Sequence, residues 1–225
     1  MEPFVIDRTG ARGWIEVICG SMFSGKTEEL IRRLRRARIA QQRIQAFKPA
    51  IDVRYSEDAT ISHDETALST TPVHAAAQIL LLADSADVVG IDEAQFFDDE
   101  LVHVCRELAA NGTRVIIAGL DQDYRGEPFE PIPQLMAVAE YVSKLHAICM
   151  VCGSPANHSQ RLVADGDRVL VGAQEAYEPR CRRCFEPNET PAPTRRPMAP
   201  RQAPNGPSSP DAVEDAPSDP APANA

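Results

Sequence analysis

The chain has 225 residues, with 23 Lys and Arg against 33 Asp and Glu and a formal net charge of −10. An average surface this acidic repels phosphate backbones and anionic membranes, so neither a nucleic acid nor a membrane is the expected partner. The sequence has no apolar run of about 18 residues and no basic start followed by an apolar signal segment, so we expect a cytoplasmic protein.

The composition changes near residue 186. Residues 186–225 hold 11 of the 19 prolines and almost no large apolar side chain. Such a stretch buries too little surface to offset the entropy lost on ordering. We therefore predict a disordered, proline-rich tail over 186–225 and a folded part over 1–185. The folded part alone keeps a net charge of −7, so its acidity does not come from the tail.

Strand-like and helix-like patterns alternate along the folded part. Strands are expected at 14–19, 43–47, 88–91 and 114–119, and helices from Lys26 and at 76–84, 99–111 and 132–144. Residues 50–72 are polar and irregular and are expected to form a loop. This alternation predicts an α/β domain over 1–145, with a parallel sheet flanked by helices.

A glycine-rich segment joins the first expected strand to the first expected helix. Its residues fit the G-x-x-x-x-G-K-[ST] pattern in the strand–loop–helix context that the pattern requires. They are Gly20, Ser21, Met22, Phe23, Ser24, Gly25, Lys26 and Thr27. Backbone N–H groups in such a loop surround a phosphate, while the lysine reaches the β- and γ-phosphates and the threonine hydroxyl holds Mg²⁺. The alternative is a glycine turn that only caps a helix.

Two acidic residues follow the strand expected at 88–91. Asp92 fits the magnesium side of a P-loop NTPase-like site, whereas Glu93 points to the other face and is placed to accept a proton from a nucleophile. The alternative is an acid pair that caps a helix beginning near Asp98. Together with the glycine-rich loop, the pair predicts NTP hydrolysis or phosphoryl transfer and leaves the acceptor open.

Four cysteines form two C-x-x-C pairs, with 28 residues between the pairs. They are Cys149, Cys152, Cys181 and Cys184. Two such pairs are typical of a structural zinc site with four thiolates. A pair of disulfides is the competing interpretation, which the absence of a secretory signal disfavours. We assign 146–185 to a small zinc-ribbon domain with a hairpin turn at 165–167.

Other conspicuous residues receive structural interpretations. Four thiolates already complete a tetrahedron, so His158 is expected to be a loop histidine, and Cys19 and Cys105 to be core thiols. Five arginines lie on the helix expected after the glycine-rich loop, and Glu28 and Glu29 precede them. This pattern predicts a solvated helix face with ion pairs, or a contact between subunits. The arginines are Arg32, Arg33, Arg35, Arg36 and Arg38.

Five stretches, in order, resemble the type II thymidine kinases. They are GSMFSGKTEEL (20–30), KPAIDVRYS (48–56), IDEAQFF (91–97), GLDQDYRGEPF (119–129) and VGAQEAYEPRCRRC (171–184), the last together with the earlier cysteine pair. The resemblance implies a P-loop kinase domain with a zinc-bearing lasso, and transfer of the γ-phosphate of ATP to the 5′-hydroxyl of thymidine. It also implies two metal ions, Mg²⁺ bound with ATP and a structural Zn²⁺. The enzyme would form a homotetramer, act in nucleotide salvage and be subject to feedback inhibition by dTTP.

The resemblance also implies a role for individual residues. Glu93 would be the catalytic base. The ATP and magnesium site would use residues 20–27 with Asp52, Arg54, Asp92 and Gln95. The thymidine site would use Met22, Phe96, Leu120, Tyr124, Phe129, Ser159, Val171 and Tyr177. Two positions depart from the commonest pattern: Ser21 stands where proline is frequent, and Tyr124 where phenylalanine is frequent.

Two other classes of protein compete with this interpretation. Residues 92–95 resemble the acidic box of DNA-dependent ATPases, but a translocase needs a second motor domain, which a folded part of net charge −7 and this length does not accommodate. A non-catalytic zinc-ribbon module would leave the glycine-rich loop and the acid pair unexplained.

Overall fold

The computed structural model describes residues 13–50, 70–163 and 176–187. Asp52, Arg54, Val171, the turn at 165–167 and nearly all of the predicted tail lie outside the described residues.

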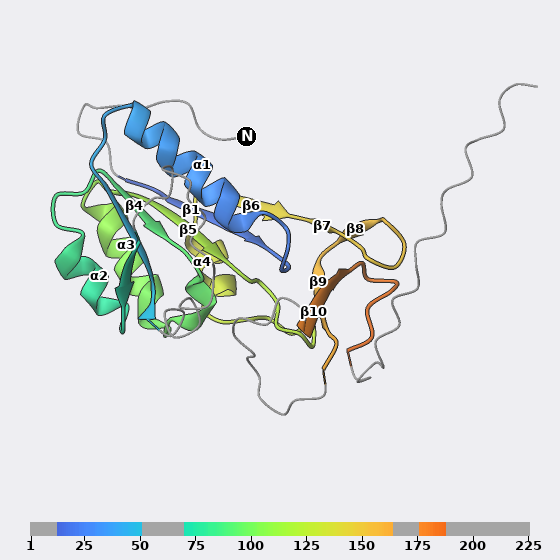
Figure 1. The fold of residues 1–225 in the computed structure, drawn as a ribbon. Coiled ribbons are helices and arrows are strands. Elements are labelled where there is room, and N and C mark those ends of the chain that lie inside the picture. Colours follow the sequence, from blue (N-terminus) through green and yellow to red (C-terminus); the bar gives the residue numbers. More distant parts are fainter. Residues whose placement is uncertain (1–12, 51–69, 164–175, 188–225) are drawn as a thin grey trace, which may run out of the picture.

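Within the described residues, six parallel strands form one sheet in the order β3-β2-β4-β5-β1-β6 (Figure 1). The strands are β1 (Ile15–Gly20), β2 (Ile44–Pro49), β3 (Thr71–Val73), β4 (Val88–Ile91), β5 (Arg114–Gly119) and β6 (Tyr141–Leu145). Every residue of β1, β4 and β5 is buried. Parallel strands covered on both faces read as continuous apolar runs, which is why the sequence revealed these three.

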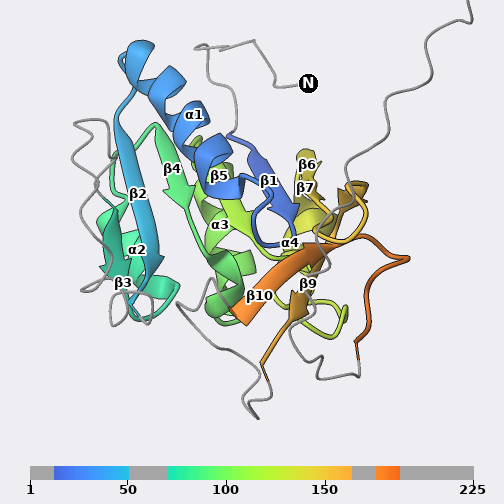
Figure 2. The ribbon, with the colours of Figure 1, turned by 45° about the vertical axis from the view of Figure 1, so that its right-hand side comes forward.

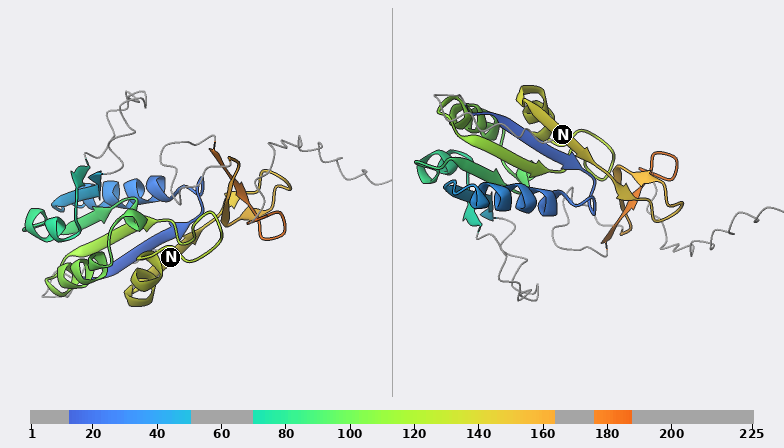
Figure 3. Two further views of the ribbon diagram at one scale, coloured as in Figure 1. Left: turned by 90° about the horizontal axis from the view of Figure 1, so that it is seen from below. Right: turned by 90° about the horizontal axis from the view of Figure 1, so that it is seen from above.

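Helices cover both faces of the sheet, so the fold has three layers (Figure 3). The helices are α1 (Lys26–Ile39), α2 (Ala77–Leu82), α3 (Glu100–Ala110) and α4 (Ile132–Val138), and a short 3₁₀ helix, η2, spans Ala94–Phe96. On one face, Leu30 and Leu34 of α1 pack on Ile18 and Ile116. On the other face, α2, α3 and α4 share the larger core. The predicted α/β fold is therefore confirmed.

Two sheet strands differ from the sequence-based expectation. The helix expected over 132–144 is wrong beyond Val138, because Ala139 is extended and residues 141–145 form β6, which pairs in parallel with β1. The aromatic and β-branched residues Tyr141 and Val142 favour a strand, and pairing with β1 fixes it. The loop expected over 50–72 also reaches too far, since Thr71 begins β3.

A small lobe lies beyond the carboxyl ends of β1 and β6 (Figures 1 and 2). It contains β7 (Ala147–Ile148), β8 (Pro155–Ala156), β9 (His158–Arg161) and β10 (Tyr177–Arg180). The strands pair antiparallel, β7 with β8 and β9 with β10. The predicted hairpin turn at 165–167 lies outside the described residues, and the described partner of β9 is β10.

The sequence predicts that His158 lies in a loop, and this prediction is wrong. His158 begins β9, is 5% exposed, and its ring is stacked on Phe185 with a centroid distance of 4.2 Å. A Cβ atom on Gly126 would come within 3.0 Å of the Phe185 ring, so a glycine in the loop after β5 lets the lobe approach closely. The imidazole therefore belongs to the contact between the lobe and the sheet domain.

Arg33 also departs from the expectation of a solvated arginine face on α1. It is 4% exposed and donates to the buried carboxylate of Glu16 on β1 at 2.7 Å. Arg114 of β5 donates to the same carboxylate at 2.6 Å. The expected helix ion pairs do form, since Glu29 accepts from the exposed Arg32 and from the buried Arg33.

Cys19 and Cys105 are fully buried in the apolar core, as predicted. None of the described helices combines the length and apolarity needed to cross a membrane.

Candidate active site and metal centre

The glycine-rich loop joins the end of β1 to the start of α1. Gly25 has a φ of 84°, in the left-handed region that glycine adopts without strain. Gly20 is confined by β6, because a Cβ atom there would lie 2.3 Å from the carbonyl oxygen of Leu145. Lys26 Nζ donates to the Ser21 carbonyl at 2.8 Å, so the ammonium group folds back over the loop.

The first turn of α1 meets the end of β4. Thr27 Oγ1 donates to the Asp92 carboxylate at 3.0 Å, and Asp92 also accepts from the Glu93 N–H at 2.9 Å. Hydroxyl and carboxylate oxygens are hard ligands of the kind that Mg²⁺ prefers. The pair therefore fits a magnesium ion that bridges to a nucleotide phosphate.

Three carboxylates lie close enough to Lys26 to affect its pKa. Burial lowers the pKa of Lys26, while the negative charges of Glu93, Asp92 and Asp121 raise it. Sequence reasoning missed Asp121, which follows β5 and pairs with Lys144 at 2.5 Å. Its position was the available signal, because an acid after a parallel strand lies at the same sheet edge as Asp92.

Glu93 has a left-handed backbone, with a φ of 49°, and immediately precedes η2. Gln95 Nε2 donates to Glu93 Oε2 at 2.5 Å, and Gln95 Oε1 accepts from the Leu120 N–H at 2.9 Å. The side chain of Gln95 thus lies between the residue that follows β4 and the residue that follows β5.

The residues expected to surround thymidine form two groups. Phe96 and Phe129 meet edge to face, with a centroid distance of 6.3 Å. Tyr124 and Tyr177 both contact the Arg161 guanidinium, whose carbon is 4.4 Å from the centroid of the Tyr124 ring and 5.7 Å from that of the Tyr177 ring. Sequence reasoning did not single out Arg161, and only its place two residues after Ser159 pointed to it.

The small lobe contacts the glycine-rich loop directly. The Met22 N–H donates to Ser159 Oγ at 3.0 Å, and Ser21 Oγ donates to the Ala156 carbonyl at 3.4 Å. Two residues expected in the thymidine site, Met22 and Ser159, are therefore joined although 137 positions separate them. Of the remaining predicted residues, Leu120 is half-buried at the end of β5.

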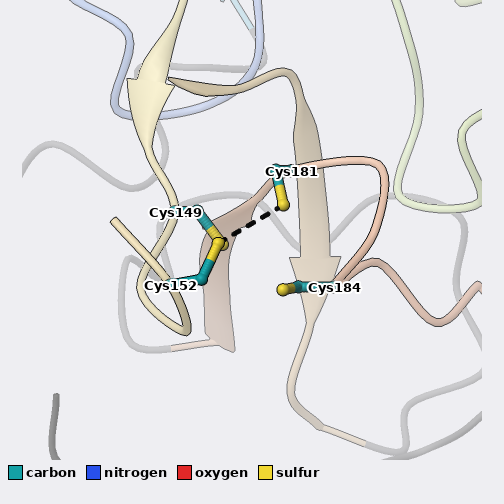
Figure 4. Close-up of side chains that lie close together, drawn as sticks. All are labelled: Cys149, Cys152, Cys181 and Cys184. Atoms are coloured by element: carbon teal, nitrogen blue, oxygen red, sulfur yellow. Dashed lines mark hydrogen bonds between the residues drawn. The ribbon is translucent and has the colours of Figure 1, made fainter. Parts of the chain in front are cut away.

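The four paired cysteines converge within the lobe, two after β7 and two after β10 (Figure 4). Their sulfur atoms all lie within 4.8 Å of one another, and Cys152 Sγ is 3.6 Å from Cys181 Sγ. A tetrahedral zinc with bonds of about 2.3 Å places its sulfurs about 3.8 Å apart, so the cluster fits that ion. All six cysteines are free thiols, so no disulfide competes for them.

Hydrogen bonds favour a thiolate in this cluster. Donation from Ser154 lowers the pKa of Cys152 to about 6, with a smaller contribution from Cys181. A thiolate is the form that binds a metal. At Cys184, in contrast, burial and the neighbouring thiols raise the pKa to about 12, so the convergence of the four sulfur atoms is the observation that indicates a metal site.

Comparison with known proteins decides the family. The family model described as thymidine kinase matches residues 13–185, well over half of the chain. The chain belongs to the thymidine kinase family. This match spans both the sheet domain and the lobe with the cysteine cluster.

Individual thymidine kinases are similar over most of their length. The chain is 70% identical over 194 residues to a thymidine kinase of Rhodothermus sp. (strain ITI 518), covering 86% of this chain and 90% of that protein. It is 60% identical over 180 residues to one of Bacteroides thetaiotaomicron, covering 80% and 90%. A solved domain III of the Thermotoga maritima replication initiation protein DnaA gives a TM-score of 0.38 at 19% identity, covering 61% of this chain and 56% of that one, which is too low to inform function.

Proposed function

We propose that this chain transfers the γ-phosphate of ATP to the 5′-hydroxyl of thymidine, giving thymidine monophosphate and ADP for nucleotide salvage. The observation that carries the proposal is the thymidine kinase match over 13–185, which contains both the glycine-rich loop and the acid pair.

Lys26 and the N–H groups of residues 20–27 hold the β- and γ-phosphates. The 5′-oxygen forms a bond to the γ-phosphorus as the bond from that phosphorus to the bridging oxygen of ADP breaks. The hydroxyl proton passes to the carboxylate of Glu93, which acts as general base. The half-buried position of Lys26 supports its role, because a partly desolvated ammonium group attracts a phosphate more strongly than a fully exposed one.

Thr27 and Asp92 are the described residues that would hold Mg²⁺, with Asp52 and Arg54 assigned to the same site by resemblance. When bound, the ion neutralises charge on the β- and γ-phosphate oxygens. Thr27 and Asp92 already contact each other, so these side chains are positioned for a shared ligand.

Thymine would lie among apolar and aromatic walls supplied by Met22, Phe96, Leu120, Tyr124 and Phe129. Ser159, Val171 and Tyr177 would belong to the lasso that covers the base. The Phe96–Phe129 contact and the packing of Tyr124 and Tyr177 against one guanidinium support this grouping, because flat rings line sites for flat bases.

The cysteine cluster would hold one structural Zn²⁺. It would anchor the lobe assigned to 146–185, whose β9 contacts the glycine-rich loop through Ser159. The phosphate-binding domain would then correspond to 1–145 and the tail to 186–225.

A homotetramer, a cytoplasmic location and inhibition by dTTP are further parts of the proposal, supported by the resemblance. The apolar side chains of Tyr141 and Val142, exposed on edge strand β6, support a contact between subunits. Sedimentation of the full chain tests the assembly, and adding dTTP to the activity assay tests the inhibition.

The deciding experiment measures ATP consumption with Mg²⁺ in the presence of thymidine, other nucleosides or single-stranded DNA, and identifies the nucleoside product by mass. Thymidine-dependent formation of the 5′-monophosphate is the expected result. Stimulation by DNA alone would instead place the chain among DNA-dependent ATPases and remove the thymidine site.

A further inference from the structure

Gln95 is almost completely enclosed, with 3% of its surface exposed. Both ends of its amide are engaged inside the protein: the nitrogen donates to Glu93 Oε2 and the oxygen accepts from the Leu120 N–H. A side chain used in this way offers little surface to a nucleotide. The contacts therefore do not match the ATP-binding role that the resemblance gave to Gln95.

The surroundings of Gln95 are shaped to hold its amide in place. A Cβ atom on Gly119 would lie 3.0 Å from Gln95 Oε1 and 2.5 Å from Ile132 Cδ1, so the glycine leaves the room that the amide occupies. Ala94, the neighbour of Gln95 in η2, is fully buried and anchors that turn in the core.

Glu93 needs such support because its own backbone is unusual. A left-handed conformation is uncommon for a residue other than glycine, and it persists only where the surrounding structure holds it. The side chain must then be oriented by contacts rather than by a regular strand or helix. Gln95 provides one of these contacts at 2.5 Å.

We propose that Gln95 is a positioning residue, which orients the carboxylate of Glu93 and ties it to the Leu120 wall of the nucleoside site. This inference deepens the proposed kinase function and rests on it. Its consequence is that Gln95 acts on the chemical step through Glu93, and not on the affinity for ATP.

Two substitutions separate the two ends of the amide. Gln95→Glu keeps the shape and an acceptor for the Leu120 N–H but replaces the amide donor with a second carboxyl 2.5 Å from Glu93, where the two groups share a proton and Glu93 is no longer a free base. Gln95→Met loses both contacts. Each is made in the parent chain and in a Glu93→Gln background, and Gln45→Met, at an exposed position on β2, is the matched control. The measurements are kcat, the dissociation constants of ATP and thymidine, and the thermal midpoint of unfolding.

In the parent background, both Gln95 substitutions are expected to lower kcat by about 10²-fold, the cost of misplacing a reacting group by about 1 Å. The dissociation constants should stay within about twofold, and in the Glu93→Gln background kcat should fall by no more than about twofold further. A purely structural role would lower kcat equally in both backgrounds. If Gln95→Met fails to fold, the same measurements on Gln95→Glu alone test the proposal.

Three results would overturn the inference: equal losses of kcat in both backgrounds, a weaker affinity for ATP without a change in kcat, or normal kcat in Gln95→Glu. The activity of the parent chain shows whether the role of Gln95 alone is wrong or the proposed kinase function is wrong as well. A parent that does not phosphorylate thymidine overturns the function and this role together, whereas an active parent with any of the three results overturns only the role of Gln95.

Discussion

The hydroxyl of Thr27 donates to the carboxylate of Asp92 across 3.0 Å, although 65 positions separate the two residues. The sheet order explains the contact. Because β5 lies between β4 and β1 and all three are parallel, the segments after β4 and β1 emerge at one edge. The phosphate loop and the acid pair are thus one site.

Asp92→Asn is expected to raise the Mg²⁺ concentration needed for half-maximal activity by about 10- to 100-fold, since an amide lacks the negative charge that attracts the ion. Titration of kinase activity with Mg²⁺ at saturating ATP and thymidine measures the change. Asp99→Asn, at an exposed position before α3, is the control. An unaltered Mg²⁺ dependence in Asp92→Asn would remove Asp92 from the proposed site.

Glu93→Gln is expected to lower kcat by about 10²–10⁴-fold, because the amide cannot accept the proton of the 5′-hydroxyl. Binding of ATP and thymidine should persist, which calorimetry checks. Glu100→Gln, an exposed change at the start of α3, serves as the matched control. Near-normal turnover in Glu93→Gln would contradict the general-base role.

The elements most readily predicted from the sequence are those whose local pattern and environment agree. The buried strands β1, β4 and β5 are mostly apolar runs, interrupted by Glu16 in β1 and begun by Arg114 in β5, and the glycine-rich loop and the cysteine pairs carry fixed spacings. β6 was mistaken for helix because its stability comes from pairing with β1, a contact between residues far apart in the chain. Long-range pairing of this kind overrides a local helical pattern.

Long-range contacts also limit what the sequence predicts within the site. Asp92 and Glu93 stand at the end of a recognisable strand, so the sequence located them. The link from Glu93 through Gln95 to Leu120 joins the ends of two strands and depends on a left-handed residue, which no local pattern reveals. Arg33 and His158 were misplaced for a related reason, because their burial depends on partners supplied by β1 and by Phe185.

The purified protein is expected to contain about one zinc per chain, and Cys181→Ser to lose it, since four thiolates are needed to close the tetrahedron. Elemental analysis measures the metal, and limited proteolysis reports whether the 146–185 lobe has opened. Cys105→Ala alters a buried thiol outside the cluster and should keep the metal. A parent protein free of zinc would refute the assignment.

Arg33→Met is expected to lower the free energy of unfolding by about 1–3 kcal/mol, because the buried Glu16 carboxylate loses one partner and keeps those from Arg114 and Trp14. Burial alone would raise the pKa of Glu16, but Arg114, Trp14 and Arg33 together lower it below its usual value. A lowered carboxyl pKa stabilises the fold above the unfolded pKa near 4.5, and this contribution disappears as the pH falls further. Urea unfolding at pH 7 and pH 4 measures both effects.

The control is Arg43→Met, which removes the exposed ion pair with Asp87 and should change the unfolding midpoint little. If Arg33→Met and Arg43→Met lower the free energy of unfolding equally, burial does not make the Glu16 ion pairs more stabilising than an exposed pair.

We expect His158 to make the contact between the lobe and the sheet domain sensitive to pH. Burial lowers the pKa of His158 below 6.5, helped by the charges of Arg182 and Lys144 and opposed by Asp121. The unfolded chain therefore binds more protons than the folded one just below pH 6.5, and stability falls as the pH drops through that window. His158→Phe, which keeps a ring against Phe185, should reduce this loss of stability between pH 7.5 and pH 5.5, measured by urea unfolding.

Comparison at each pH with His103→Gln isolates the effect, because His103 is exposed on α3 and pairs only at the surface with Glu107. Protonation of the cysteine cluster lowers stability in parent and variants alike, so only the difference between them reports on His158. If His158→Phe loses as much stability as the parent between the two pH values, protonation of this imidazole does not weaken the contact between the lobe and the sheet domain.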